Sequence, residues 1–193
     1  MPDPESAATL DHPEAIKGAP LSGEVFRRTM GRFVTGVTVV TTRFGDELHG
    51  MTANSVTSVS LDPLLVLVCV DKKADTHDML MKAGVFAVNI LGRHQGEVSV
   101  RFARRSEEWS HDMEGMPHHF AVTGAPIIDG CLAYLDCRTV IEHHGGDHTI
   151  FIGEVVGAGE TSDADPLVFY RGRYGGFTDS PADSTAGDRR AAE

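Results

Sequence analysis

Residues 72–76 (KKADT) follow an apolar run and precede a stretch with helical spacing, and their types suit the binding of an anion. The free N–H groups and the dipole at the start of a helix attract negative charge. Lys73 would add a positive point charge, whereas Asp75 would repel a phosphate. A solvated turn capped by Thr76 explains the same residues, so both interpretations stay open.

Residues 144–148 (HGGDH) contain two histidines four positions apart. On a helix this spacing would put His144 and His148 on one face, where they could bind a metal. The intervening Gly145, Gly146 and Asp147 favour a tight turn between strands instead, so we expect a hairpin and no metal site. His148 changes charge near neutral pH and could position a ligand, although an incidental histidine in a turn is the alternative.

Residues 52–59 (TANSVTSV) are small, polar and β-branched. Hydroxyl and amide side chains offer hydrogen bonds, and small residues let a ligand approach the backbone closely. On composition alone, a polar strand on the surface of a barrel is the favoured interpretation.

Common nucleotide-binding motifs are absent from the sequence. No G-x-G-x-x-G motif follows a strand, and Gly31 and Gly36 have P-loop spacing but are followed by Val37-Thr38 where a lysine is required. Neither a G-x-S-x-G elbow nor an H-E-x-x-H motif occurs. A nucleotide would therefore bind on the surface of a barrel.

Extended segments dominate the expected secondary structure. Helices are predicted over residues 23–34 (capped by Ser22), 76–83 (capped by Thr76, ended by Gly84) and 95–103. Strands are predicted over 37–44, in two pieces of 48–60 that bend near 53–55, and over 64–70, 85–91, 131–143, 148–158 and 167–170. Because turns join neighbouring strands, we predict a mainly β, antiparallel barrel with a few peripheral helices.

Length and composition fit one domain. The 193 residues carry a net charge of −11, much of it in the terminal segments. Residues 1–20 and 178–193 lack apolar periodicity, so we expect a flexible arm and a disordered tail around a domain at 21–177. The absence of a basic stripe argues against nucleic-acid binding, and acidic surfaces repel anionic membranes.

The cysteines and apolar runs indicate a soluble, cytoplasmic protein. Cys69, Cys131 and Cys137 form no C-x-x-C pair and lie in apolar runs, so we expect buried thiols in a reducing compartment. The N-terminus lacks the features of a signal peptide, and the longest apolar run, 64–70, is too short to span a membrane.

Four blocks occur in the order found in the short-chain flavin reductases. The sequence resembles this family at residues 26–42 (FRRTMGRFVTGVTVVTT), 50–70 (beginning GMTANSVTSVSLDP), 146–155 (GDHTIFIGEV) and 166–174 (PLVFYRGRY). The family comprises NAD(P)H:flavin oxidoreductases that serve as reductase components of two-component flavin-dependent monooxygenases. The resemblance implies an FMN-binding split β-barrel of Greek-key type and a homodimer.

The same resemblance assigns residues to a flavin, either FMN or FAD. Small side chains near residue 53 would let the isoalloxazine ring approach the backbone, and the loop at residue 73 would contact the phosphate or ribityl tail. At residue 56 the family often has an aromatic residue, so the valine here would widen the site or loosen the flavin. The implied flavin-binding residues are Thr52, Ala53, Asn54, Ser55, Val56, Ser58, Val59, Lys73, Ala74, Asp75, Phe102, Ala103 and Arg104.

A second set is implied for the nicotinamide nucleotide, NADH or NADPH. His148 is the candidate catalytic residue, because hydride transfer to flavin needs alignment of the rings more than a strong acid or base. The implied NAD-binding residues are His148, Arg173, Tyr174, Gly175 and Gly176. The expected function is hydride transfer from NADH or NADPH to FMN or FAD and supply of reduced flavin to a separate monooxygenase.

Two other functions fit the same residues. The first is a reductase that keeps its flavin and reduces its own acceptor, such as ferric iron. The second is a split-barrel module that binds flavin or haem without catalysis. A pyridoxamine-phosphate oxidase fits the four blocks less well.

Overall fold

The computed structural model describes residues 21–103 and 113–178. The expected terminal arm and most of the expected tail, together with Arg104, lie outside these residues. The described helices are α1 (Gly23–Met30), α2 (Asp75–Ala83) and α3 (Gly96–Ala103), with a short 3-10 turn, η1 (Arg93–Gln95). None of them is long and apolar enough to cross a membrane.

The strands confirm a mainly β, antiparallel fold. They are β1 (Thr35–Gly36), β2 (Thr38–Phe44), β3 (Glu47–Ala53), β4 (Val56–Leu61), β5 (Leu64–Asp71), β6 (Val85–Ile90), β7 (His118–Phe120), β8 (Pro126–Ile128), β9 (Ala133–Gly145), β10 (His148–Glu160), β11 (Leu167–Tyr170) and β12 (Arg173–Gly176). The main sheet has the order β3-β2-β6-β9-β10-β5-β4, and smaller sheets have the orders β1-β11-β12 and β7-β8.

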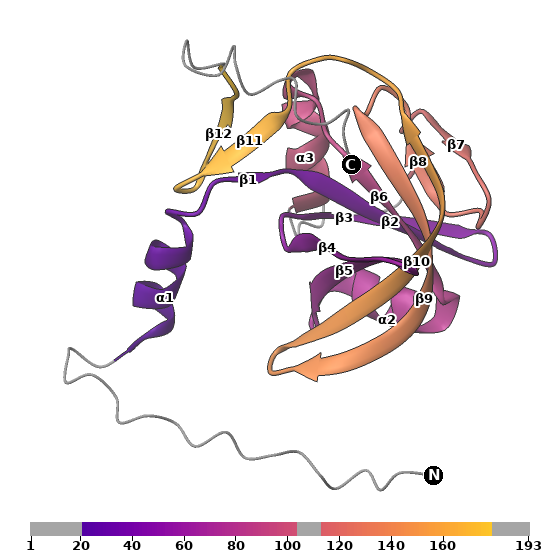
Figure 1. Ribbon diagram of the computed structural model, residues 1–193, viewed down its shortest axis with the longest axis horizontal. Coiled ribbons are helices and arrows are strands. Elements are labelled where there is room, and N and C mark those ends of the chain that lie inside the picture. The colour runs from indigo at the N-terminus through magenta and orange to yellow at the C-terminus, as the bar shows by residue number, and fades with distance from the viewer. Residues whose placement is uncertain (1–20, 104–112, 179–193) are drawn as a thin grey trace, which may run out of the picture.

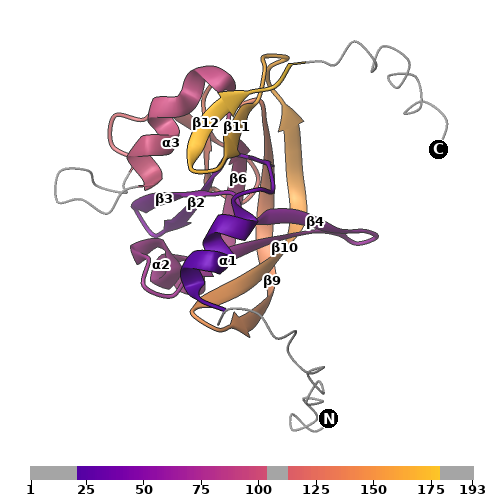
Figure 2. The same ribbon diagram turned by 90° about the vertical axis from the view of Figure 1, so that its left-hand side faces the viewer.

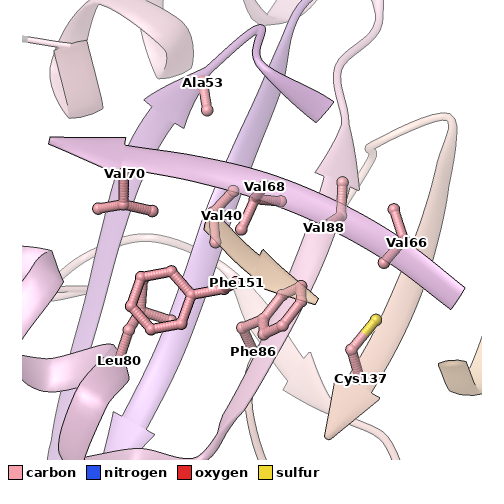
Figure 3. Packing of buried hydrophobic residues seen from close by; sticks show 10 residues of the cluster. All are labelled: Val40, Ala53, Val66, Val68, Val70, Leu80, Phe86, Val88, Cys137 and Phe151. Carbon is pink, nitrogen blue, oxygen red and sulfur yellow. The ribbon is translucent and has the colours of Figure 1, made fainter. Parts of the chain in front are cut away.

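The main sheet curls around a core that faces its concave side (Figures 1 and 3). Figure 3 shows Phe86, Phe151 and Leu80 packed against the valines of β2, β5 and β6. Since strands from both halves of the sheet order contribute to this one cluster, their apolar faces must turn toward each other. Burial of these side chains is the main driving force for the curl.

The two edge strands of the main sheet meet at one point in the sequence. β3 and β4 lie at opposite ends of the strand order, yet only Asn54 and Ser55 separate them in the chain. The chain therefore joins the two edges of the sheet at Asn54-Ser55, which we call the seam. Edge strands carry backbone N–H and C=O groups without a strand partner, so the seam can offer hydrogen bonds to a ligand.

Capping residues in the sequence predicted most helix ends to within one residue. The Ser22 hydroxyl accepts a hydrogen bond from the Val25 N–H at 3.2 Å, and α1 ends at Met30, before the expected Val34. Gly84 ends α2 with a φ of 63°, a conformation that glycine adopts without strain.

Two expectations about packing were wrong. Thr76 does not cap α2, since it lies buried inside the helix, with its hydroxyl 2.8 Å from His49 Nδ1; the capping position belongs to Ala74. β5 is not buried on both faces: burial alternates along it, which leaves Cys69 partly exposed, whereas Cys131 and Cys137 are buried as expected. A continuous apolar run conceals this alternation because one of its faces lines a surface groove.

Candidate functional site

The seam fixes Asn54 and Ser55 by hydrogen bonds to two different elements. The Asn54 side-chain amide donates to the Thr35 hydroxyl of β1 at 3.2 Å. The Ser55 hydroxyl donates to the Cys69 carbonyl of β5 at 2.9 Å, and the Cys69 N–H donates to the Ser55 carbonyl at 3.1 Å. These hydrogen bonds hold the bend in place. Both side chains remain exposed, so the bend is accessible to a ligand.

Two grooves open along the seam. The first, which we call the α1 groove, has a volume of about 800 Å³ and is lined by Phe26, Arg27 and Met30 of α1, by Asn54, Ser55 and Val56, and by Cys69 and Phe169 among others. The second, the β4 groove, has a volume of about 630 Å³ and contains Ser58, Leu61 and Leu64. Asn54, Val56 and Thr57 belong to both, so the grooves are continuous at the seam. Their lining is mostly apolar with a few polar groups, as is usual for cofactor sites.

The loop after β5 lies close to the seam. Cys69 lines the α1 groove, and Asp71, two residues further along the same strand, begins the turn that leads into α2. At the rise of a β-strand, two residues correspond to about 7 Å. A ligand ring at the seam could therefore extend a tail toward residues 72–76.

The β9–β10 turn is fastened to that same loop. His148 pairs with Asp71 across the strands. The Lys72 ammonium group donates to the Gly146 carbonyl at 2.6 Å, and the Lys72 N–H donates to the Asp147 carbonyl at 3.0 Å. The fold thus brings together two segments, 72–76 and 145–148, that the sequence separates by about 70 residues.

Asp147 and His148 form an exposed pair. His148 Nδ1 lies 2.8 Å from Asp147 Oδ1. This hydrogen bond, then the charge of His148 and a smaller contribution from Lys73, lower the pKa of the Asp147 carboxyl. Asp147 stays ionised over the neutral range and orients the imidazole, with little effect on stability because water screens exposed pairs.

β12 carries Tyr174 onto α3. The Tyr174 hydroxyl lies 2.8 Å from the hydroxyl of Ser99, and the Ser99 carbonyl accepts a hydrogen bond from the Thr52 hydroxyl at 2.7 Å. The Tyr174 ring also packs against Phe169, with ring centroids 5.7 Å apart. Thr52 and Tyr174, which the sequence assigned to different ligands, are therefore linked through one residue.

Some of the expected site residues lie away from the grooves. Phe102 is 1% exposed and packs against Gly50 in the second core cluster, so it can support a site but offers no face to a ligand. Val59 is exposed and lines neither groove. Within one chain, His148 lies at the end of the β9–β10 turn, whereas Arg173–Gly176 lie at the opposite end of the molecule (Figures 1 and 2).

Sequence reasoning missed several residues of the grooves. Arg27 and Met30 of α1, Cys69 and Phe169 line the α1 groove, and none was assigned to the site. The sequence gives no signal for Cys69, because every residue of the run 64–70 is apolar and the alternation of burial along β5 appears only in the structure. Among the described residues, no group of three or more His, Cys, Asp or Glu side chains could hold a metal ion.

The fold is a curled antiparallel sheet with an accessible polar seam between its two edge strands. The chain belongs to the flavin reductase-like domain family, whose model matches residues 30–178. It is therefore an oxidoreductase of the flavin reductase type.

Three relatives show how broad the similarity is. The chain is 40% identical over 153 residues to the FMN reductase (NADH) SmoA of Agrobacterium fabrum, covering 79% of this chain and 85% of that protein. It is 37% identical over 161 residues to HsaB of Mycobacterium tuberculosis, the reductase subunit of a flavin-dependent monooxygenase, covering 82% and 84%. The structure of the Streptomyces globisporus NADH:FAD oxidoreductase SgcE6 with NAD and FAD fragments matches with a TM-score of 0.75 and 41% identity, over 82% of this chain and 94% of that one.

Proposed function

We propose that this protein transfers hydride from NADH to an exchangeable flavin, FMN or FAD, and supplies the reduced flavin to a separate monooxygenase. The observation that carries this proposal is the seam, where hydrogen-bonding side chains and an edge of the sheet open into two joined grooves. SmoA is an FMN reductase that uses NADH, SgcE6 is an NADH:FAD oxidoreductase and HsaB is the reductase subunit of a flavin-dependent monooxygenase, which supports the same chemistry here.

The seam residues fit a flavin in their chemistry. Asn54, Ser55 and the free backbone groups of the strand edges can bind the polar edge of an isoalloxazine ring, while Val56 and the apolar lining of the grooves cover its faces. Lys73 and the N–H groups at the start of α2 can hold the phosphate. The flavin supplies the redox chemistry, and the chain binds, orients and shields it.

Two segments would bind the nicotinamide nucleotide, and because they lie at opposite ends of one folded chain (Figures 1 and 2), a single nucleotide would contact both only across two copies of the chain. Tyr174 offers a ring face and Arg173 a cation for the pyrophosphate, with Gly175 and Gly176 allowing close approach. His148, held by Asp147, can position the carboxamide. The apolar lining of the grooves would shield a bound flavin and nicotinamide from water.

Steady-state kinetics test this proposal. Purified protein should oxidise NADH in air at a rate that saturates with added FMN or FAD, because the flavin acts as a substrate. Comparing both flavins, and NADH with NADPH, identifies the preferred pair. Absence of NADH oxidation with either flavin would refute the proposal.

We also propose that the protein works in the reducing cytoplasm, because its described cysteines are free thiols.

We propose further that the protein is a homodimer. No residue of α1 is buried, and the helix stands off the sheet (Figure 1). Phe33 is 69% exposed, and Met30, Leu61 and Leu64 are exposed along the same grooves. Such a continuous apolar surface is typical of a protein–protein contact, and a second copy would cover α1 and narrow the grooves.

Replacing Phe33 with glutamate should convert the dimer to a monomer. A carboxylate at this position would have to lose its hydration among apolar side chains in the interface, at a cost that weakens dimerisation by about 100-fold or more. Light scattering after gel filtration would measure the change. Val140→Glu, at an exposed position of β9 outside both grooves, is the control, and a monomeric wild-type protein would contradict the proposal.

Flavin should protect Cys69 from alkylation. Burial raises the pKa of the Cys69 thiol, so its reaction with iodoacetamide should be slow at neutral pH and accelerate as the pH rises toward that pKa. Because Cys69 lines the α1 groove, saturating FMN or FAD should slow its labelling about fivefold or more. Burial raises the pKa of Cys137 to about 12, so Cys137 should stay unlabelled in the folded protein.

Mass spectrometry of the labelled protein distinguishes the three cysteines. The matched control is the Ser55→Trp variant. Its indole would occupy the flavin's place in the α1 groove, so added flavin should give no protection. Equal labelling rates of wild-type Cys69 with and without saturating flavin would contradict the placement of flavin in the α1 groove.

A further inference from the structure

We propose that Ser99 is a positioning residue for the nicotinamide nucleotide, because it holds Tyr174 at a fixed place relative to the flavin-binding strand. This inference rests on the proposed function and adds a residue that is not part of either predicted binding set. Ser99 lies in the middle of α3 and is 0% exposed, so it cannot itself contact a ligand. Its effect on the reaction must pass through its neighbours.

The two polar groups of Ser99 point to two different strands. Its carbonyl accepts from the Thr52 hydroxyl of β3 at 2.7 Å, and its hydroxyl lies 2.8 Å from the Tyr174 hydroxyl of β12. Thr52 precedes Ala53 and Asn54, where β3 reaches the seam. A single buried residue therefore sets the distance between the seam strand and the tyrosine.

Tyr174 is held in a way that leaves one side free. Its ring packs on Phe169, which also lines the α1 groove, and its hydroxyl is fixed on Ser99. The side chain remains 41% exposed and lines a further groove along α3, about 730 Å³ in volume, with Val98 and Arg101. A ring held by Phe169 and by its own hydroxyl is a preformed stacking surface, so binding a nicotinamide or adenine ring on it orders no flexible side chain.

The hydroxyl is unusual for its place in the helix. A serine inside a helix commonly bonds to a carbonyl of the preceding turn or faces solvent. Ser99 instead partners a tyrosine 75 residues away. The conventional interpretation, that it merely stabilises the fold, predicts a different result from the positioning role.

The test compares Ser99→Ala, Tyr174→Phe and the double variant. Losing one neutral hydrogen bond should raise the Kd for NAD⁺ and the KM for NADH about three- to tenfold in either single variant. The double variant should be no worse than the singles, because both remove the same bond. The Kd for flavin should change less than twofold, because Ser99→Ala keeps the carbonyl that accepts from Thr52.

Calorimetric titration with NAD⁺, fluorescence titration with FMN and FAD, and NADH kinetics supply the readouts, with thermal unfolding alongside. Thr42→Val is the matched control: Thr42 is also fully buried and donates one hydrogen bond, to the Val85 carbonyl, but lies away from the seam. It should lose stability without a change in NAD⁺ affinity. Tyr174→Phe, at a partly exposed position, carries the test if Ser99→Ala does not fold.

Two outcomes would overturn the inference in distinguishable ways. An active wild-type protein whose single variants bind NAD⁺ and FMN as tightly as wild type would refute the positioning role and leave the proposed function standing. A wild-type protein that neither binds NAD⁺ nor oxidises NADH with added flavin would refute the proposed function and the inference together.

Discussion

Replacing Ser55 with tryptophan should weaken FMN and FAD binding by about 100-fold or more. A loss of this size corresponds to a free-energy cost at or above the upper end of the range usual for overpacking. Ser55 is exposed at the seam and lines the α1 groove beside Asn54 and Cys69. An indole there would occupy space that the isoalloxazine ring needs, and the bond to the Cys69 carbonyl would be lost. Quenching of flavin fluorescence measures the affinity directly.

The control for Ser55→Trp is Val140→Trp on β9. Val140 is exposed and lines neither groove, so the same large side chain should leave flavin affinity and NADH oxidation unchanged. Circular dichroism should show that both variants fold. A folded Ser55→Trp protein with wild-type affinity for both flavins would remove the seam as the flavin site.

Replacing Gly153 with valine should cause the largest loss of stability. A Cβ atom at this position would lie 2.5 Å from Phe86 Cζ and 2.9 Å from Cys137 Cβ, and both residues are fully buried. Neither neighbour has free space, so the strand or the ring must move. We expect a cost of about 3 kcal/mol or more, which lowers Tm by roughly 10 °C or prevents folding.

Gly36→Val is the matched control for this change. Gly36 also lies in a strand, but a Cβ atom there would meet nothing within 4 Å. Its Tm should stay within a few degrees of wild type. Equal Tm values for the two variants would contradict the tight packing between β10 and β6.

Secondary structure was predictable where a local signal fixes it. The bend between β3 and β4 falls at Asn54-Ser55, two residue types that favour turns, and Gly84 ends α2 because glycine accepts a positive φ. Signals that depend on tertiary packing failed. Thr76 appeared to be a cap but is buried against His49, and β12, with two glycines among its four residues, has too little apolar pattern to be recognised.

The candidate site was predictable only as separate segments. Residues 52–56, 72–76 and 145–148 could be named from the sequence, but not that the open edge of the sheet lies at the first, or that Lys72 ties the second to the third. Ser99 and Cys69 gave no signal because their roles come from neighbours far away in sequence. Phe102 shows the converse, since family resemblance places it near a ligand but the fold buries it in the core.

Reduction of excess flavin without oxygen tests the central claim most directly. Protein in an amount far below that of the flavin is mixed with NADH and either FMN or FAD, and the loss of flavin absorbance is followed. If the protein is a reductase that releases its product, all the flavin should be bleached, with one NADH consumed per flavin. If only one equivalent of flavin per protein is reduced, or none, the protein does not supply free reduced flavin and the account is wrong.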